Sequence, residues 1–383
     1  MKIKLLTILL LLFTTGCWNY RELNEYAIVT GISIDYDNNK YEVSALFANG
    51  KTKEEEKSQI TLSTGSGNTI YEAIKNISLS TPKDINISHL SVVIISEDVA
   101  KNGITPVLDY LIRDPQAHQN FYIVIAKDTK AKNILSVINP LSDYPSQNIT
   151  STIKITEQLL ARVTDASFNK FVTKILDKGI NPVANSIILV GKEEEGTQKE
   201  KQENSVTKAY TKLDKLAIFK EDKLIDWADE EESIGINMLL GNIKSLYLNI
   251  PCNDNYIVVT TSSYSIKNNI KKDKISVNIN AIGNIGEVGC SINLNNKKEI
   301  DKIEKLAKNK MYTFTNKALY KAKSLKTDIF GYGNLIYKKY PRYFNSIDKW
   351  DNMFQKLDID INISLSITNT ESLDKSIGEL KNE

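Results

Sequence analysis

The sequence predicts an α+β protein of several parts, with a mixed α/β N-terminal region and a C-terminal antiparallel sheet packed by a long helix. Three observations lead to this fold class. In the first half, apolar β-branched runs alternate with stretches of helical spacing. Between residues 300 and 325, apolar side chains recur every three to four positions, which indicates an amphipathic helix. Residues 358–367 alternate strictly between polar and apolar side chains, which is typical of a strand with one buried face.

The N-terminal region begins with a predicted β-hairpin over residues 27–35 and 40–47. Asp37-Asn38-Asn39 between the two runs favours the turn. Asn68 is expected to cap a helix that carries Ile70, Ala73, Ile74 and Ile77 on one face. Further on we expect a buried strand over 89–95, a helix from Ser96 to about 111, a strand over 121–126, a short helix over 131–137, helices over 156–162 and 168–176, and a strand over 185–190.

A polar segment divides the chain. Residues 192–205 carry no apolar side chain and are predicted to form a linker or loop. The expected divisions are a signal peptide over 1–16, an N-terminal α/β domain over 17–191, the polar segment over 192–205, a small middle region over 206–250 with strands at 213–219 and 224–227, and a C-terminal domain over 251–383. The last contains expected strands at 256–264, 274–282 and 286–294 and the helical stripe Ile300, Ile303, Leu306, Met311, Phe314, Ala318, Ala322 and Leu325.

The first sixteen residues have the pattern of a leader that precedes Cys17. Lys2 and Lys4 precede an apolar run over 5–13, which as a helix would reach only about 14 Å against roughly 30 Å of bilayer hydrocarbon. Small residues at 14–16 and then Cys17 resemble a bacterial lipobox. We therefore expect the mature protein to begin at Cys17 and to hang from a membrane by acyl chains such as palmitate. The alternative is an ordinary secretory signal followed by an incidental cysteine.

Composition excludes several classes of function. The chain has 49 Lys and Arg against 47 Asp and Glu, and loss of residues 1–16 removes two lysines and no acid, so the mature formal charge is zero. A neutral chain offers no electrostatic basis for nucleic-acid binding. After the leader, no run of 18 apolar residues predicts a membrane span.

Cysteine and histidine are too few for a metal site or a catalytic centre of the usual kinds. Only Cys252 and Cys290 remain beside Cys17, and the histidines are His89 and His118. These do not provide zinc-ligand spacing, and the chain has no phosphate-binding glycine loop, HExxH or GxSxG motif. We therefore expect no catalytic residue, metal or cofactor. Cys252 and Cys290 form either one disulfide or two buried thiols, and their spacing leaves both open.

Four weaker candidates each have a structural alternative that the residues favour. Gly65-Ser66-Gly67 could bind an anion, but a turn before a helix is favoured, and Asp229–Glu232 could bind a cation, but the start of a helix is favoured. His118 could act as a base, but a polar turn residue is favoured. A last group could form a nucleic-acid patch, but a packing or partner surface is favoured; it consists of Tyr332, Tyr337, Tyr340 and Tyr343 with Lys338, Lys339 and Arg342.

The segment Gly16-Cys-Trp-Asn-Tyr-Arg-Glu-Leu-Asn-Glu25 resembles the start of the mature C subunits of spore germinant receptors, the Ger(x)C lipoproteins. The similarity continues through 31–35, His89, Ser96-Glu97, 111–115, 217–225, 330–333, Tyr340-Pro341, Trp350 and Phe354. Two positions depart from the family pattern. His118 stands where many members carry Arg, and Asp226-Trp227 replaces a usual Gly.

The resemblance implies a non-enzymatic subunit anchored through Cys17 to the outer face of the spore inner membrane. Its implied partners are two integral-membrane receptor subunits, and its implied role is in germination in response to nutrients. It adds no catalytic, metal or cofactor residue. The alternative is a lipid-anchored solute-binding protein of a transporter, which usually has two similar α/β lobes, whereas the C-terminal region here reads as antiparallel with one long helix.

Overall fold

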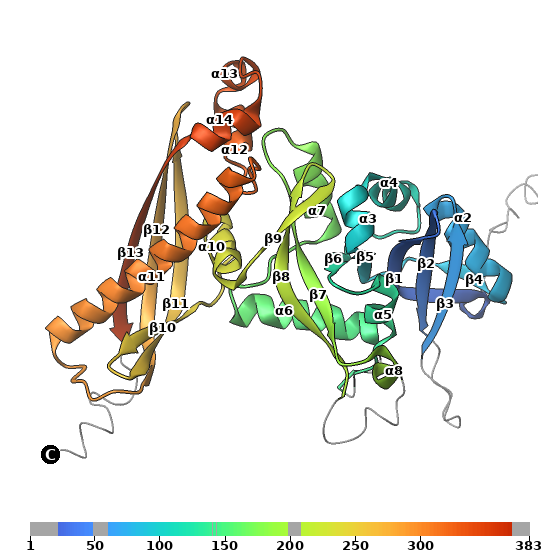
Figure 1. Cartoon of the computed structure of the whole chain (residues 1–383), viewed down its shortest axis with the longest axis horizontal. Coiled ribbons are helices and arrows are strands. Elements are labelled where there is room, and N and C mark those ends of the chain that lie inside the picture. The colour runs from blue at the N-terminus through green and yellow to red at the C-terminus, as the bar shows by residue number, and fades with distance from the viewer. Residues whose placement is uncertain (1–21, 49–59, 140, 143, 198–207, 370–383) are drawn as a thin grey trace, which may run out of the picture.

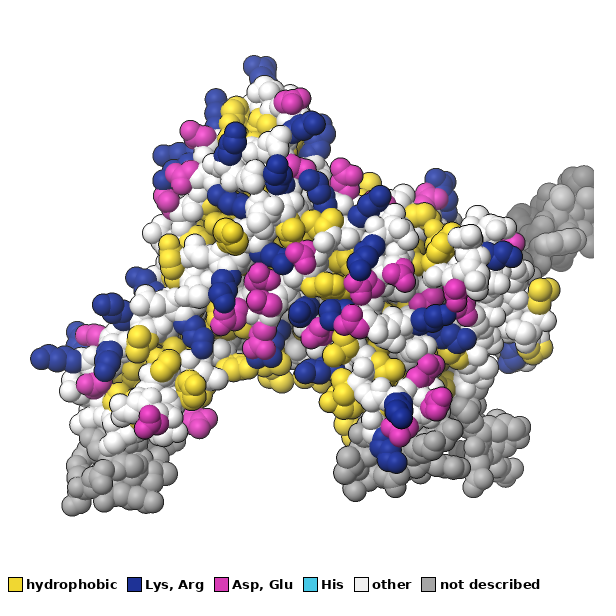
Figure 2. Space-filling view, viewed as in Figure 1, with side chains coloured by type: hydrophobic (Ala, Val, Ile, Leu, Met, Phe, Trp, Pro, Cys, Tyr) yellow, Lys and Arg dark blue, Asp and Glu magenta, His cyan; other side chains and the backbone are white. Residues whose placement is uncertain are grey.

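The computed structural model describes residues 22–48, 60–139, 141–142, 144–197 and 208–369. It contains two separate sheets, which lie toward opposite ends of an elongated molecule and are joined through helices at its centre (Figure 1). The predicted α+β class is confirmed. Basic and acidic side chains are interspersed across the face in Figure 2, as the balanced charge of the sequence leads one to expect.

The first sheet has nine strands in the order β3-β2-β1-β5-β6-β7-β8-β9, and β4 pairs with the start of β1. The strands are β1 Tyr26–Asp37, β2 Lys40–Ala48, β3 Ile60–Gly67, β4 Asp84–Asn86, β5 Val92–Ser96, β6 Tyr122–Ala126, β7 Val183–Val190, β8 Tyr210–Lys220 and β9 Lys223–Ala228. Strands β1, β5, β6 and β7 are parallel, and the outer strands are antiparallel. The predicted hairpin is confirmed, since Asp37 pairs with Lys40 around Asn38 and Asn39, which both have positive φ.

Helices cover both faces of this sheet. The helices and short 3-10 turns are η1 Leu23–Glu25, α2 Ile70–Ile77, η2 Ser78–Ser80, α3 Glu97–Asn102, α4 Thr105–Arg113, α5 Ala131–Ser136, α6 Pro145–Leu159, α7 Phe168–Leu176 and α8 Glu193–Gly196. Val93 and Ile95 of β5 pack in one apolar cluster with α2, α3, α4 and α7. Val92 and Ile94 pack in another with α5 and α6. Because both faces are covered, β5 is apolar at four successive positions.

The second sheet has four strands in the order β10-β11-β12-β13. Its elements are β10 Tyr247–Cys252, β11 Asn255–Ile270, β12 Lys274–Val288, α11 Lys297–Ser324, α12 Tyr332–Lys339, α13 Pro341–Asn345, α14 Trp350–Lys356 and β13 Asp358–Asn369. Strands β10, β11 and β12 are antiparallel, as expected for this sheet, although β10 itself was not predicted; β13 runs parallel to β12. The connection between them contains all four helices, and such a crossover returns the chain in the same direction, whereas a hairpin reverses it.

The predicted packing of the long helix against the last strand is confirmed. Met311 and Phe314 of α11 lie in one apolar cluster with Ile363 and Leu365 of β13. Leu306 was placed on the buried stripe, but it is 38% exposed, and Ala307 is buried in its place. The buried stripe of α11 keeps a spacing of three to four residues through Ile303, Ala307, Met311, Phe314, Ala318 and Ala322, and it therefore passes through Ala307 rather than Leu306.

Helix α10 (Glu230–Leu240) connects the two sheets and packs against α11. A Cβ atom at Gly235 would lie 2.0 Å from the carbonyl oxygen of Phe314, so only glycine permits the two helix backbones to approach this closely. Two ion pairs also connect the halves of the molecule. Lys321 of α11 pairs with Asp226 of β9 at 2.8 Å, and Lys220 of β8 pairs with Asp351 of α14 at 2.6 Å.

Several predicted boundaries were wrong. The helix expected over 156–162 begins at Pro145, because proline is well suited to the first turn of a helix. The helix from Ser96 is divided into α3 and α4 at Gly103, which has a φ of 120°. Thr69 rather than Asn68 caps α2, and its Oγ1 accepts from the N–H of Glu72 at 3.1 Å. Of the strand expected over 286–294, residues 286–288 form the end of β12, and residues 289–294 belong to no named strand.

Residues 206–250, predicted as a middle region, are shared between the two halves. Strands β8 and β9 extend the first sheet, and β10 begins the second. Within the polar segment, Glu193–Gly196 forms a helical turn with Gly196 buried, and residues 198–207 lie outside the described part of the chain. Cys252 and Cys290 form a disulfide with a Cα–Cα distance of 6.1 Å, which decides between the two possibilities that their spacing left open.

Candidate functional site

Cys17, the one site residue predicted from the sequence, lies outside the described residues. The described chain begins at Glu22, five residues later.

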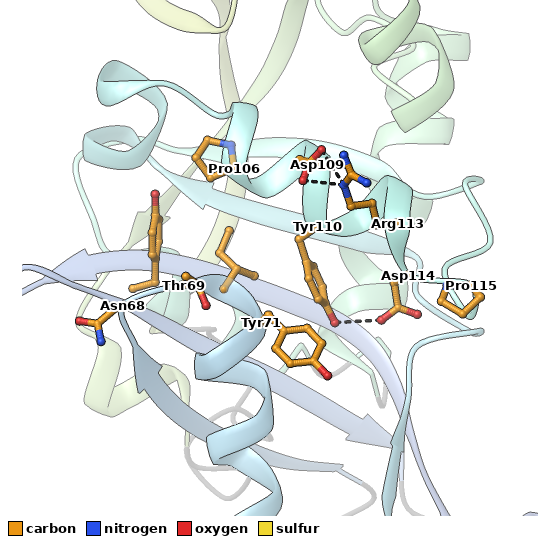
Figure 3. A pocket seen from close by; sticks show the side chains of 11 residues that line it. Asn68, Thr69, Tyr71, Pro106, Asp109, Tyr110, Arg113, Asp114 and Pro115 are labelled. Carbon is orange, nitrogen blue, oxygen red and sulfur yellow. Dashed lines mark hydrogen bonds and ion pairs between the residues drawn. The ribbon is translucent and has the colours of Figure 1, made fainter.

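A groove of about 690 Å³ lies between the first turn of α2 and helix α4 (Figure 3). Its volume is in the range of small-molecule and peptide sites. The walls include three aromatic rings, from Tyr41 on β2, Tyr71 on α2 and Tyr110 on α4. The Tyr71 and Tyr110 rings meet edge to face at 6.4 Å between centroids, and Tyr71 is 61% exposed. The groove thus presents accessible aromatic surface held in a defined position.

Charged side chains line the α4 side of the groove. The Nε atom of Arg113 donates to both carboxylate oxygens of Asp109, at 3.0 and 2.9 Å. The Tyr110 hydroxyl donates to Asp114 at 3.0 Å, and burial together with this carboxylate raises the pKa of Tyr110, so the phenol stays neutral. The Arg113 side chain is 76% exposed, and its terminal Nη atoms take no part in the contact with Asp109.

The segment Leu111 to Pro115, which carried part of the resemblance, forms this wall. Leu111 points into the core, while Arg113, Asp114 and Pro115 line the groove. Asp114 also accepts from the N–H of Gln116 at 2.9 Å, which fixes the turn that ends α4. The sequence marked this segment by similarity, but it gave no signal for Tyr41 or Tyr71, which only the packing of β2 and α2 brings opposite α4.

A second polar centre, which the sequence reasoning missed, lies where the two halves join. Asp328 is fully buried before α12. Its carboxylate accepts from the N–H groups of Phe330 at 3.2 Å, Gly331 at 2.9 Å, Tyr332 at 3.2 Å and Gly333 at 2.7 Å, and from Nε1 of Trp350 at 3.1 Å. Burial is the largest influence and raises the pKa of Asp328 to about 6, against the lowering effect of these donors.

The loop around Asp328 bonds directly to the N-terminal half. The Asp328 carbonyl accepts from the N–H of Asn181 at 2.8 Å, and the Thr327 hydroxyl donates to the carbonyl of Phe219 at 2.9 Å. The N–H of Asn334 donates to the carbonyl of Gly179 at 3.1 Å. Asp328 therefore organises a joint between the two sheets. In the sequence, Asp328 stands two residues before Phe330-Gly-Tyr-Gly333. Its position could have indicated this role, because the backbone N–H groups at the start of a helix need an acceptor.

The structure gives the weaker candidates structural roles. Gly65 and Gly67 lie in β3 rather than in a turn, and a Cβ at Gly65 would lie 2.2 Å from the carbonyl oxygen of Ala73 in α2. Asp229 and Glu232 form a capping box at the start of α10. His118 is in a turn after α4, where its carbonyl accepts from the N–H of Asn120 at 2.7 Å.

The tyrosine cluster is largely a packing feature. Tyr332 is fully buried, and the rings of Tyr337 and Phe344 are 5.5 Å apart. Among the residues that the structure describes, no group of three His, Cys, Asp or Glu side chains could hold a metal ion. In the same residues no helix is both long enough and apolar enough to cross a membrane.

A solved structure with the same fold identifies the class of protein. A solved structure of the GerBC protein superposes with a TM-score of 0.52 over 88% of this chain and 97% of that one, at 18% sequence identity. At this identity the match establishes a shared two-sheet α+β fold.

Sequence matches then identify the family. The model of the spore germination protein N-terminal domain matches residues 19–189, and that of the spore germination B3/GerAC-like C-terminal domain matches residues 214–371. Spore germination protein KC of Bacillus subtilis is 27% identical over 96% of this chain and 95% of its own length. Spore germination protein B3 of the same organism is 22% identical over 96% and 97%. The chain belongs to this family, the C subunits of spore germinant receptors.

Proposed function

We propose that this chain is the lipid-anchored, non-catalytic C subunit of a nutrient germinant receptor. The supporting observation is that both family domains match in order and that relatives align over 96% of the chain. In this proposal the protein sits on the outer face of the spore inner membrane beside two integral-membrane subunits. Deletion of its gene should leave sporulation intact and impair the response to one class of nutrient. Normal responses to every nutrient, in a strain without a redundant receptor, would contradict the role.

The anchor is the lipid on Cys17. The lipobox-like ending at 14–17 supports it, and a tether confines the folded part close to its membrane partners. Cys17→Ala should abolish metabolic labelling with a palmitate analogue. Cys252→Ser is the matched control, because it removes a thiol engaged in the disulfide and should leave the labelling intact. Equal labelling of the Cys17→Ala protein would exclude this anchor.

The groove between α2 and α4 is the surface we assign to contacts within the receptor. Tyrosine and arginine are enriched at protein interfaces, and the groove presents Tyr71 and Arg113 with side chains that are largely exposed. A cysteine at Tyr71 should cross-link to an integral-membrane subunit in spore membranes, whereas one at Tyr320, which is 77% exposed on α11, should not. Cross-linking that is equal at both positions would remove this assignment.

A further inference from the structure

We infer that the turn formed by residues 78–83, the tip, rests on the lipid surface and places Leu79 in the headgroup region. The inference rests on the proposed anchor at Cys17. The occupant is a lipid bilayer, and the exposed side chain of Leu79 is the group that enters it.

The position of the tip relative to the anchor is the first argument. Strand β4 runs parallel to the start of β1, with Asp84 beside Tyr26, and the tip leads directly into β4. The tip therefore lies next to the point where the described chain begins. The five residues from Cys17 to Glu22 span at most about 18 Å when fully extended. A lipid on Cys17 thus keeps this end of the molecule, where β4 and α2 lie farthest from the second sheet (Figure 1), within that distance of the bilayer.

The construction of the tip is the second argument. Leu79 is 87% exposed in η2. The hydroxyls of Ser80 and Thr81 turn back and donate to the carbonyl of Ile77, at 3.1 and 3.0 Å. Their hydrogen-bonding needs are therefore met inside the turn, which lowers the cost of removing them from water. A single exposed leucine is common on protein surfaces; this one stands on an ordered turn beside the anchored end.

The charged residues near the tip indicate that its contact with the lipid is apolar. Lys83 is accompanied by Asp84 and by Glu25 at the same end of the sheet, so the tip carries no net attraction for anionic lipid. One leucine cannot hold a protein on a membrane, but it can orient a protein that a lipid chain already holds there. In that orientation the groove lies one helix length from the bilayer, because α2 runs from the groove to the tip and its eight residues span about 12 Å.

The test uses the mature chain with a hexahistidine tag in place of Cys17, bound to phosphatidylcholine vesicles that contain a nickel-chelating lipid. An environment-sensitive fluorophore is attached at Leu79→Cys, with Tyr320→Cys as the matched exposed control. We expect a blue shift at position 79 and quenching by a nitroxide on the lipid headgroup at least about twofold stronger than at position 320. Both effects should persist when the salt concentration is raised from 0.05 to 0.5 M, because the contact is apolar.

Equal quenching at the two positions on vesicle-bound protein, or a signal at position 79 that salt abolishes, would overturn the inference. Because the nickel lipid supplies the tether, the result does not depend on modification of Cys17. Failure of the palmitate labelling would therefore contradict the anchor without changing this assay, and failure of the quenching would contradict the tip contact alone.

Discussion

Strand β5 of the first sheet and strand β13 of the second are covered in different ways. All five residues of β5 are buried, since helices lie on both faces of its sheet. In β13, Ile363 and Leu365 are buried against α11 while Asn362 and Ser364 are exposed. Strand β5 at the centre of the first sheet therefore offers a partner no free face, and the groove and the tip lie toward the end of that sheet. In the second sheet, α11 packs against the strands, and side chains of α10, α12 and α14 complete the same apolar cluster.

The largest effect on stability is expected from a charge placed on the buried face of α11. Phe314→Asp should lower the free energy of unfolding of the C-terminal half by more than about 4 kcal/mol, because an unpaired carboxylate would be buried where 4% of the side chain is now exposed. Tyr320→Asp, on the exposed side of the same helix, is the control and should cost little. Denaturant unfolding followed by circular dichroism measures both. A normal transition for Phe314→Asp would show that α11 does not cover the sheet.

The disulfide should matter next. Cys252 and Cys290 are 38 residues apart in sequence, and in the chain-entropy model a loop of this length corresponds to about 3–4 kcal/mol. The double variant Cys252→Ser, Cys290→Ser should lose this amount from the C-terminal half, and wild-type protein under reducing conditions should melt in the same way. Identical melting of oxidised and reduced protein would show that the second sheet does not need the bridge.

The joint between the two halves should give a smaller, pH-dependent effect. Because the pKa of Asp328 is raised from 3.8 to about 6, the folded protein holds a proton there that the unfolded chain releases at lower pH. The contribution of this proton to the free energy of unfolding is complete below pH 3.8 and is lost as the pH rises through 6. From pH 4.5 to 7, the wild type should lose about 2 kcal/mol relative to Asp328→Asn. Parallel profiles would mean that the five donors keep the carboxylate ionised throughout.

The smallest effect on stability is expected in the groove. Tyr71→Ala should change the free energy of unfolding by less than about 0.5 kcal/mol, because the side chain is largely in water. If the groove is a contact surface, the same variant should slow germination, and Tyr320→Ala should not. A large loss of stability would instead make Tyr71 a packing residue, which would weaken the contrast between the buried centre of the first sheet and the accessible groove at its end.

Sequence patterns predicted the elements whose cause is local. The Asn38-Asn39 turn, the apolar face of α2 and the alternation in β13 each follow from side chains a few positions apart. Pairings between distant segments were not predictable in this way. The parallel direction of β13 follows from the helical crossover before it, and the extension of the first sheet by β8 follows from its register with β7.

The sequence by itself determined the fold class and the family, and it alone carries the prediction of a leader over residues 1–16 followed by Cys17. These are carried by periodicity, by a short motif and by residues matched in order, none of which needs a contact between distant segments. The tertiary structure alone decided the disulfide, the burial of Asp328 at the joint and the position of the turn that carries Leu79 near the start of β1. Each of these is a distance between segments that are far apart in sequence, and local propensity contains no information about such distances.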